Sequence, residues 1–184
     1  ILAKAVPESE YTRAAKQLLG LLRMAEGEWD DAAIAFKEIY LTDPETVSTS
    51  LRLTSEAYLE KARAKLQDGA QDEAIAAIDQ AIAVYKGQTG KEALQQRNTL
   101  RLLRARLLTQ IGRFELAIAD LQNFTIQQPQ NFEALITLAS LYASVEHWES
   151  LEAVIKPIAK RPELRDVVLY LSLIHISEPT RHAS

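Results

Sequence analysis

Residues 16–44 read KQLLGLLRMAEGEWDDAAIAFKEIYLTDP, and four positions of this segment recur later in the chain. Gly27, Trp29, Ala32 and Pro44 are matched at identical internal spacings by Gly112, Phe114, Ala117 and Pro129. Leu19-Gly20 is matched less well, by Arg104-Ala105. Recurrence at a fixed spacing is the mark of a repeat protein, in which each unit packs against its neighbours. The sequence therefore predicts a repetitive architecture.

The composition is typical of a helical protein. Good helix formers abound among the 184 residues, whereas Gly and Pro occur only six times each. The net charge of −4 is too small to indicate a nucleic-acid or membrane-surface partner. Cysteine is absent, which excludes disulfides and thiolate chemistry, and no apolar run approaches the roughly 18 residues of a membrane span.

Apolar residues recur with the helical period between Gly and Pro breaks, and strand-like alternation is absent, so we expect an all-α chain. Gly27 and Gly112 are expected to close helices in the left-handed conformation. Asp43-Pro44 is expected to begin a helix, and Pro157 to kink or shorten one. Residues 1–6 look like a helix end. The predicted helices are 9–26, 30–40, 44–67, 71–85, 91–111, 114–126, 132–145 and 148–160, with a ninth beginning at 163.

The repeated positions resemble the tetratricopeptide repeat (TPR), a 34-residue helix–turn–helix unit with the pattern W-x₂-L-G-x₂-Y…A-x₃-F…P. The resemblance covers about residues 9–163. The matching sets are Lys16, Leu19, Gly20, Arg23, Ala32, Phe36 and Pro44; Tyr58, Lys61, Ala62, Lys65, Ala74, Ile78 and Lys86; Arg101, Arg104, Ala105, Leu108, Ala117, Leu121 and Pro129; and Leu135, Leu138, Ala139, Tyr142, Leu151, Ile155 and Glu163.

Small residues at Gly20, Ala62, Ala105 and Ala139 should let paired helices approach closely, with Phe36 and its equivalents filling the space between them. Trp29, Phe114 and Trp148 share one position after the turn. Successive units are 42, 43 and 34 residues apart. We therefore expect first helices about two turns longer in the second and third units, as in long-helix variants of the family.

The resemblance implies a right-handed α-α superhelix, a solenoid of about four repeats with partial units at both ends, that binds a peptide or protein on its concave face. First helices line that face in this family. The residues carried over to it are Gln17, Leu21, Met24, Leu59, Glu60, Arg63, Leu102, Arg106, Thr109, Gln110, Glu133, Thr137 and Ser140.

Two groups of basic residues admit alternative interpretations. Arg63 and Arg106 occupy equivalent positions and suit a peptide carboxylate, although solvated arginines paired with Glu60 or Glu56 explain them better. Two basic stripes could meet an acidic partner, although solvated outer faces are the favoured explanation. The stripes are Arg97, Arg101 and Arg104 on one helix, and Lys61 and Lys65 on another. The positions that clamp chaperone tails in some relatives hold Gln17, Leu21, Glu60, Thr99 and Leu103, and do not match.

Catalytic chemistry finds little support. His147 lies in a turn, in place of the glycine of the other units, and has no second histidine or spaced carboxylate pair beside it. Asp30 and Asp31 fall in a first helical turn, where they complement the helix dipole. Residues 87–90 (Gly-Gln-Thr-Gly) do not follow a strand, as a phosphate loop would. We predict no catalytic, cofactor or metal site.

Residues 171–181 (LSLIHISEPTR) resemble the translated adapter of a sequencing library. We therefore interpret residues 1–170 as a TPR-like α-solenoid fragment and residues 171–184 as a non-native tail. The main functional hypothesis is a non-enzymatic scaffold for protein–protein interaction. The alternative is the regulatory or substrate-docking arm of a larger enzyme or signalling protein.

Overall fold

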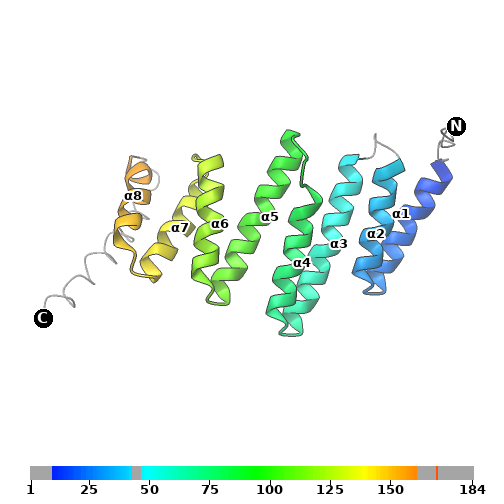
Figure 1. Ribbon diagram of the computed structural model, residues 1–184, viewed down its shortest axis with the longest axis horizontal. Coiled ribbons are helices and arrows are strands. Elements are labelled where there is room, and N and C mark those ends of the chain that lie inside the picture. Colours follow the sequence, from blue (N-terminus) through cyan, green and yellow to red (C-terminus); the bar gives the residue numbers. More distant parts are fainter. Residues whose placement is uncertain (1–9, 43–46, 161–168, 170–184) are drawn as a thin grey trace, which may run out of the picture. The chain divides into compact units, whose positions relative to one another are not determined.

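The structure is a computed structural model that describes residues 10–42, 47–160 and 169 (Figure 1). This part of the chain is all-α, as predicted, with helix bounds within a few residues of those expected. Two predicted helix ends, at 1–6 and at 44, lie outside the described residues. The predicted ninth helix also lies outside them, except for Leu169. The helices are α1 (Glu10–Ala25), α2 (Trp29–Thr42), α3 (Val47–Gln67), α4 (Gln71–Val84), α5 (Lys91–Gln110), α6 (Phe114–Gln127), α7 (Phe132–Ser144) and α8 (Trp148–Ala159).

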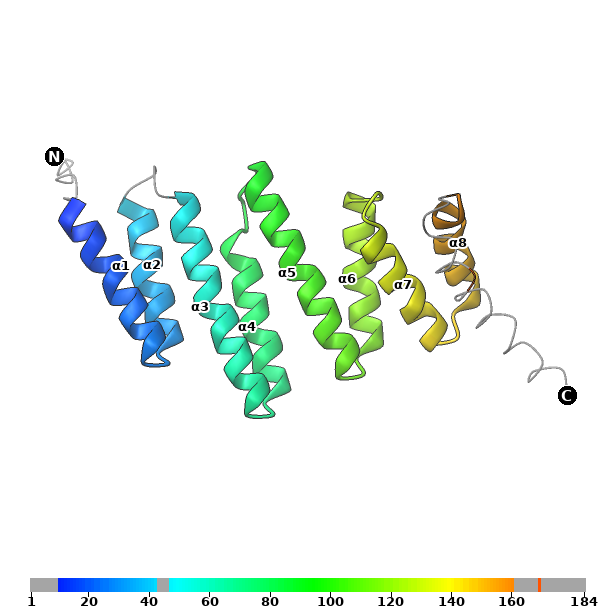
Figure 2. The ribbon, with the colours of Figure 1, turned by 180° about the vertical axis from the view of Figure 1, so that it is seen from behind.

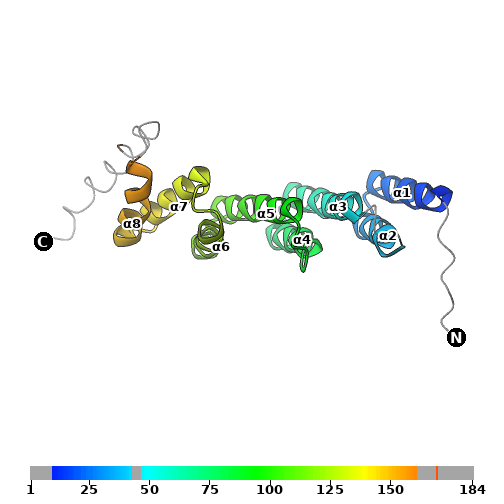
Figure 3. The same ribbon diagram turned by 90° about the horizontal axis from the view of Figure 1, so that it is seen from above.

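The chain divides into two compact units, Ile1–Leu100 and Arg101–Ser184, and the boundary falls within α5. In the first unit α1 packs on α2, α2 on α3 and α3 on α4, so consecutive helices lie side by side (Figures 1 and 2). Seen from above, α1 and α3 form one layer of this unit and α2 and α4 the other (Figure 3). In the second unit α6 packs on α7, and α7 on α8.

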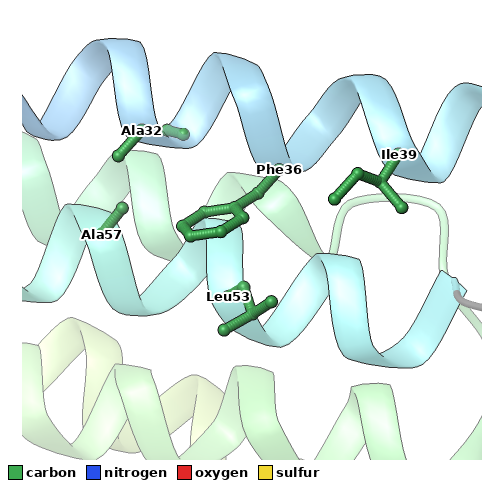
Figure 4. Packing of buried hydrophobic residues seen from close by; sticks show 6 residues of the cluster. Ala32, Phe36, Ile39, Leu53 and Ala57 are labelled. Carbon is green, nitrogen blue, oxygen red and sulfur yellow. The ribbon is translucent and has the colours of Figure 1, made fainter. Parts of the chain in front are cut away.

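Apolar clusters join the helices of the first unit. Phe36 and Ile39 of α2 lie against Leu53 and Ala57 of α3, with Ala32 at one end (Figure 4). Phe36, Ala32 and Ala57 have no exposed surface, so α2 and α3 are in direct contact. A second cluster joins α3, α4 and the first half of α5. Its buried members are Leu51, Ala81, Tyr85 and Leu100.

Small residues are buried where the repeat pattern places them. Gly20, Ala62, Ala105 and Ala139 on first helices, and Ala32, Ala74 and Ala117 on second helices, are all buried. The large residues between them are buried in three units, as Phe36, Ile78 and Leu121. In the fourth unit Ile155, at the equivalent position, is only half-buried, whereas Ile158 on the same helix is fully buried. Close helix packing at these positions is therefore confirmed, except at Ile155.

Four helix–helix turns share one geometry. Gly27, Gly69, Gly112 and Glu146 all have positive φ, between 58° and 77°. In each turn the following residue donates its N–H, at 2.8 Å, to a carbonyl five residues earlier, as Glu28 does to Arg23. This pattern closes a helix with a left-handed residue, where glycine costs least. The left-handed ends predicted at Gly27 and Gly112 are confirmed.

The turn before α8 corrects one prediction. Glu146, not His147, occupies the glycine position of the fourth unit, with a φ of 58°. His147 is the residue immediately before α8, and its carbonyl accepts the N–H of Leu151 at 3.1 Å. Glu28, Ala70 and Arg113 accept in the same way in the other turns. The fourth repeat therefore keeps the turn geometry without keeping the glycine.

The lengths of the first helices agree with the unequal repeat spacing. α3 and α5 have 21 and 20 residues, whereas α7 has 13, so the predicted two extra turns are confirmed. Asn131 lies immediately before α7 and caps it, because its side-chain oxygen accepts the N–H of Ala134 at 3.0 Å. α8 continues past Pro157 to Ala159, one residue short of its predicted end.

The helix predicted at 9–26 takes its period from Leu18, Leu19, Leu22 and Ala25, and the described residues leave this apolar stripe exposed. Leu18 and Leu22 are 66% and 55% exposed, and Leu19 is 45% exposed. α2 contacts the other side of α1 instead, through Gly20 and Met24. The periodicity therefore predicted the helix correctly but not which face of it is buried here.

Candidate binding site

The layer of the first unit that contains α1 and α3 carries two hollows, each lying between first helices. One lies between α1 and α3 with Ile39 of α2 beneath it, and has a volume of about 310 Å³. Arg13 and Gln17 line it on the α1 side. Gln17 is thus the first predicted binding residue that the structure places in a concave site.

The second hollow, which we name the α3/α5 hollow, has a volume of about 220 Å³ and Tyr85 at the end of α4 beneath it. Three predicted residues, Leu59, Glu60 and Arg63, lie together on its α3 side. Spacings of one and three residues on a helix bring these side chains to neighbouring positions. The remaining lining residues are Arg52, Ser55, Glu56, Gln96 and Leu100.

Charges along the wall of the α3/α5 hollow alternate in sign. Arg52 and Glu56 form an ion pair at 3.2 Å, and Arg63 pairs with Glu60. All four side chains are more than one-third exposed, so these pairs contribute little to stability and open easily. The wall therefore offers both guanidinium and carboxylate groups to a polar ligand.

Tyr85 gives the α3/α5 hollow a polar group at its base. Its side chain is buried and is hydrogen-bonded to Ser55. Burial raises the pKa of Tyr85 above 10.0, helped by Glu92 and Glu56 and opposed by the Ser55 hydrogen bond and by Arg52. The phenol therefore stays protonated at neutral pH. A smaller cavity of about 170 Å³ also reaches Arg52, Tyr85 and Gln96 from the beginning of α3.

The other predicted residues of the first unit are less well placed. Leu21 is 44% exposed on α1. Met24 is half-buried and packs against the cluster around Phe36, so part of its side chain serves the contact between α1 and α2. Its position faces α2 because Gly20, one turn earlier, allows that helix to approach closely.

In the second unit the predicted residues lie on α5 and α7. An ion pair between Arg106 and Glu133 joins these helices. Thr109 and Thr137 donate their hydroxyls at 2.8 Å to carbonyls of their own helices, so they are poorly placed as ligand donors. Leu102 is half-buried, whereas Gln110 and Ser140 are exposed.

The arginine pair is explained by local ion pairs. Arg63 lies in the first unit and pairs with Glu60, as the favoured interpretation expected. Arg106 lies in the second unit and pairs with Glu133 of the next first helix, a partner that the sequence did not indicate. Glu56 is paired with Arg52 instead.

The two basic stripes are not the solvated faces that we expected. Arg97, Arg101 and Arg104 are half-buried, and Arg104 forms a 2.5 Å ion pair with Asp120 of α6. Nε of Arg97 and Nη1 of Arg101 are buried, and the described residues offer these two atoms no acceptor.

On α3, Lys61 pairs with Asp30 at 2.7 Å and Lys65 with Glu73 at 2.8 Å. The hydrogen bond to Glu73 raises the pKa of Lys65. Lys61 thus links α3 to α2, and Lys65 links α3 to α4. The aliphatic part of a lysine side chain can pack against a neighbouring helix while its ammonium group forms an ion pair.

Few features of the described residues suggest catalysis. Asp30 and Asp31 lie in the first turn of α2, as predicted. The His147 ring lies 5.8 Å from the Tyr142 ring, centroid to centroid. Residues 10–42 and 47–160 contain no group of three or more His, Asp or Glu side chains arranged to hold a metal ion. Over the same ranges, none of the helices combines the length and the apolar character needed to cross a membrane.

Comparison with known proteins gives no match, either to protein-family models or to curated proteins. The site is therefore interpreted from its own geometry.

Sequence reasoning missed Arg52, Ser55, Tyr85 and Gln96. One signal was available, because Arg52, Glu56, Glu60 and Arg63 follow one face of α3 at spacings of four, four and three residues. Tyr85 and Gln96 reach the hollow only through the packing of α4 and α5.

Proposed function

We propose that this chain is a non-enzymatic interaction module of the TPR type that binds a peptide or a peptide-like segment of a partner protein. The four equivalent turns, the buried small residues and the lengthened α3 and α5 support the repeat assignment. The finer part of the proposal is that the repeats form a right-handed α-α superhelix, as the resemblance to the family implies.

One observation carries the functional proposal: the α3/α5 hollow contains three residues that the repeat pattern had assigned to ligand binding. Leu59 and Leu100 supply apolar surface, while Arg63 and Glu60 supply charged groups of both signs. A peptide presents an apolar side chain beside backbone and charged groups, so it matches this lining. Binding of this kind depends on a few well-packed contacts more than on area.

The proposal is tested by selecting peptides from a displayed library against the full chain and measuring their affinities by calorimetry. Arg63→Glu reverses a charge at the rim, and Gln96→Arg places a larger side chain in the hollow. Each should weaken a selected peptide by at least about tenfold, the effect of 1.4 kcal/mol. Lys91→Glu, an exposed substitution at the beginning of α5 that does not line the hollow, is the matched control and should leave affinity unchanged.

Two results would contradict the proposal. The first is equal affinity of the selected peptides for the chain and for both hollow variants. The second is failure of the library to yield any peptide that binds the folded chain.

A further inference from the structure

The first unit has a further cavity in its other layer, between α2 and α4, which we name the α2/α4 cavity. It has a volume of about 370 Å³, and Leu51, Thr54 and Tyr58 of α3 contribute to its lining. The second helices α2 and α4 form the other layer of this unit (Figure 3) and both line this cavity, whereas the lining of the α3/α5 hollow comes from α3, α5 and Tyr85. The two sites are therefore distinct.

The charged groups of the α2/α4 cavity are all of one sign. Lys37 of α2 and Lys86 after α4 line it, and among the described residues its lining contains no Asp or Glu. The α3/α5 hollow, by contrast, combines two arginines with Glu56 and Glu60. In a chain whose net charge is −4, a cavity whose described lining has two cations and no carboxylate is a local exception. It attracts anions in particular.

The base of the α2/α4 cavity is mainly apolar. Leu51 is buried and Tyr58 and Val84 are half-buried around it. The two buried hydroxyls in the lining are already used as donors, Ser50 to the carbonyl of Phe36 and Thr54 to that of Ser50 at 2.7 Å. The base therefore offers packing surface, and the lysine ammonium groups at the wall supply the charged donors.

We propose that the α2/α4 cavity binds a small organic anion, a carboxylate attached to an apolar body of about the size of one or two aromatic rings. The volume lies near the lower end of the range of about 300–1,000 Å³ found for small-molecule pockets. Burial of the apolar body against Leu51, Tyr58 and Val84 supplies affinity, and Lys37 and Lys86 orient the carboxylate.

The test uses 2-naphthoate as the probe and the neutral 2-naphthamide as its matched analogue, with the full chain labelled for amide NMR. Naphthoate should shift the amide signals of Leu51, Ala83 and Val84, and the dissociation constant follows from the titration. The amide analogue should bind at least about tenfold more weakly, since a charge-assisted hydrogen bond contributes more than 1.4 kcal/mol.

Lysine variants then test whether the ammonium groups of Lys37 and Lys86 bind the carboxylate of naphthoate. Lys37→Met combined with Lys86→Met keeps the apolar stems and removes both cations, and it should weaken naphthoate by at least about tenfold. Lys91→Met removes one exposed cation of α5 that does not line the cavity, and it should leave the affinity unchanged. A thermal melt of each variant checks that the fold is kept.

The proposal is overturned if naphthoate and naphthamide bind equally, if the double variant binds as tightly as the original chain, or if the shifted signals belong to the α3/α5 hollow. Acetyl-Ala-Ala-Phe with a free carboxyl terminus distinguishes a peptide source. If this peptide binds more tightly than naphthoate and shows the same dependence on the lysines, a peptide terminus is the occupant and the small-molecule assignment is wrong.

Discussion

Gly20 of α1 and Phe36 of α2 lie so close together that there is no room for a Cβ between them. A Cβ built at position 20 would lie 2.7 Å from Cζ of the phenyl ring and 2.8 Å from its Cδ1. Phe36 itself has no exposed surface and also packs against Leu53 and Ala57. The ring is therefore enclosed on its other sides, and the contact with Gly20 limits how closely α1 approaches α2.

Gly20→Ala should destabilise the first unit. Alanine favours a helix interior over glycine by about 1 kcal/mol, but overpacking of a tight core costs about 1–3 kcal/mol. We expect a net loss of up to about 2 kcal/mol, measured by urea unfolding followed by circular dichroism. Combining it with Phe36→Leu should make the alanine less harmful than it is alone, as a double-mutant cycle reveals. A stabilised single variant would show that the contact is looser than described.

Phe36→Ala and Trp29→Ala should differ in cost. Phe36 is completely buried, so its truncation should cost about 3–5 kcal/mol, the usual range for a buried phenylalanine. Trp29 is only half-buried where it covers the turn at Gly27, and its truncation should cost about 1–2 kcal/mol. Equal losses in urea unfolding would show that Trp29 is as much a part of the core as Phe36.

The sequence predicted those features that depend on local pattern. Helix ends follow from residues such as Gly27 and Asn131, and the small positions at Gly20 and Ala105 follow from repeat spacing. Local signals are strong there because backbone conformation and close packing restrict the residue type. The left-handed position before α8 was not predicted correctly, because Glu146 and not a glycine occupies it. From the sequence, this position was assigned to the neighbouring His147 instead.

The candidate site was predicted only in part, for a physical reason. Helical spacing indicates which residues share a face of α3, and it correctly grouped Leu59, Glu60 and Arg63. Whether a neighbouring element lies beside that face depends on tertiary packing. Tyr85 enters the hollow through contacts with Leu51 and Leu100, which are distant from it in sequence. The ion pairs of Lys61 and Arg104 have the same origin.

Two ion pairs of the second unit provide a matched comparison of burial. The side chains of Arg104 and Asp120 are only 21% and 19% exposed, whereas those of Arg106 and Glu133 are 54% and 61% exposed. Asp120→Asn should cost about 1–3 kcal/mol because it leaves a half-buried guanidinium without its charged partner. Glu133→Gln should cost less than about 0.5 kcal/mol, as is usual for exposed pairs. Urea unfolding of both variants checks this, and equal losses would contradict the role assigned to burial.

Tyr85 should make stability fall at alkaline pH. Burial raises its pKa in the folded chain above the value of 10.0 that applies when the chain is unfolded. As the pH rises past 10, the unfolded chain loses this proton first, so it binds fewer protons than the folded chain and stability decreases. The contribution is complete below pH 10 and is lost as the pH passes through the folded pKa. Tyr85→Phe should show a smaller decrease in unfolding free energy over this range; an identical decrease would exclude Tyr85 as its source.

Glu146→Gly should stabilise the turn before α8. A non-glycine residue in the left-handed region costs about 1 kcal/mol, and Glu146 is the described residue that bears this cost with a φ of 58°. Its side chain is exposed, so the substitution removes little packing. We expect a gain of about 0.5–1 kcal/mol in unfolding free energy. Glu146→Ala is the matched control, because it removes the same side chain but keeps the strain, and it should give no gain. If alanine stabilises as much as glycine, the loss of the carboxylate rather than the backbone conformation is responsible.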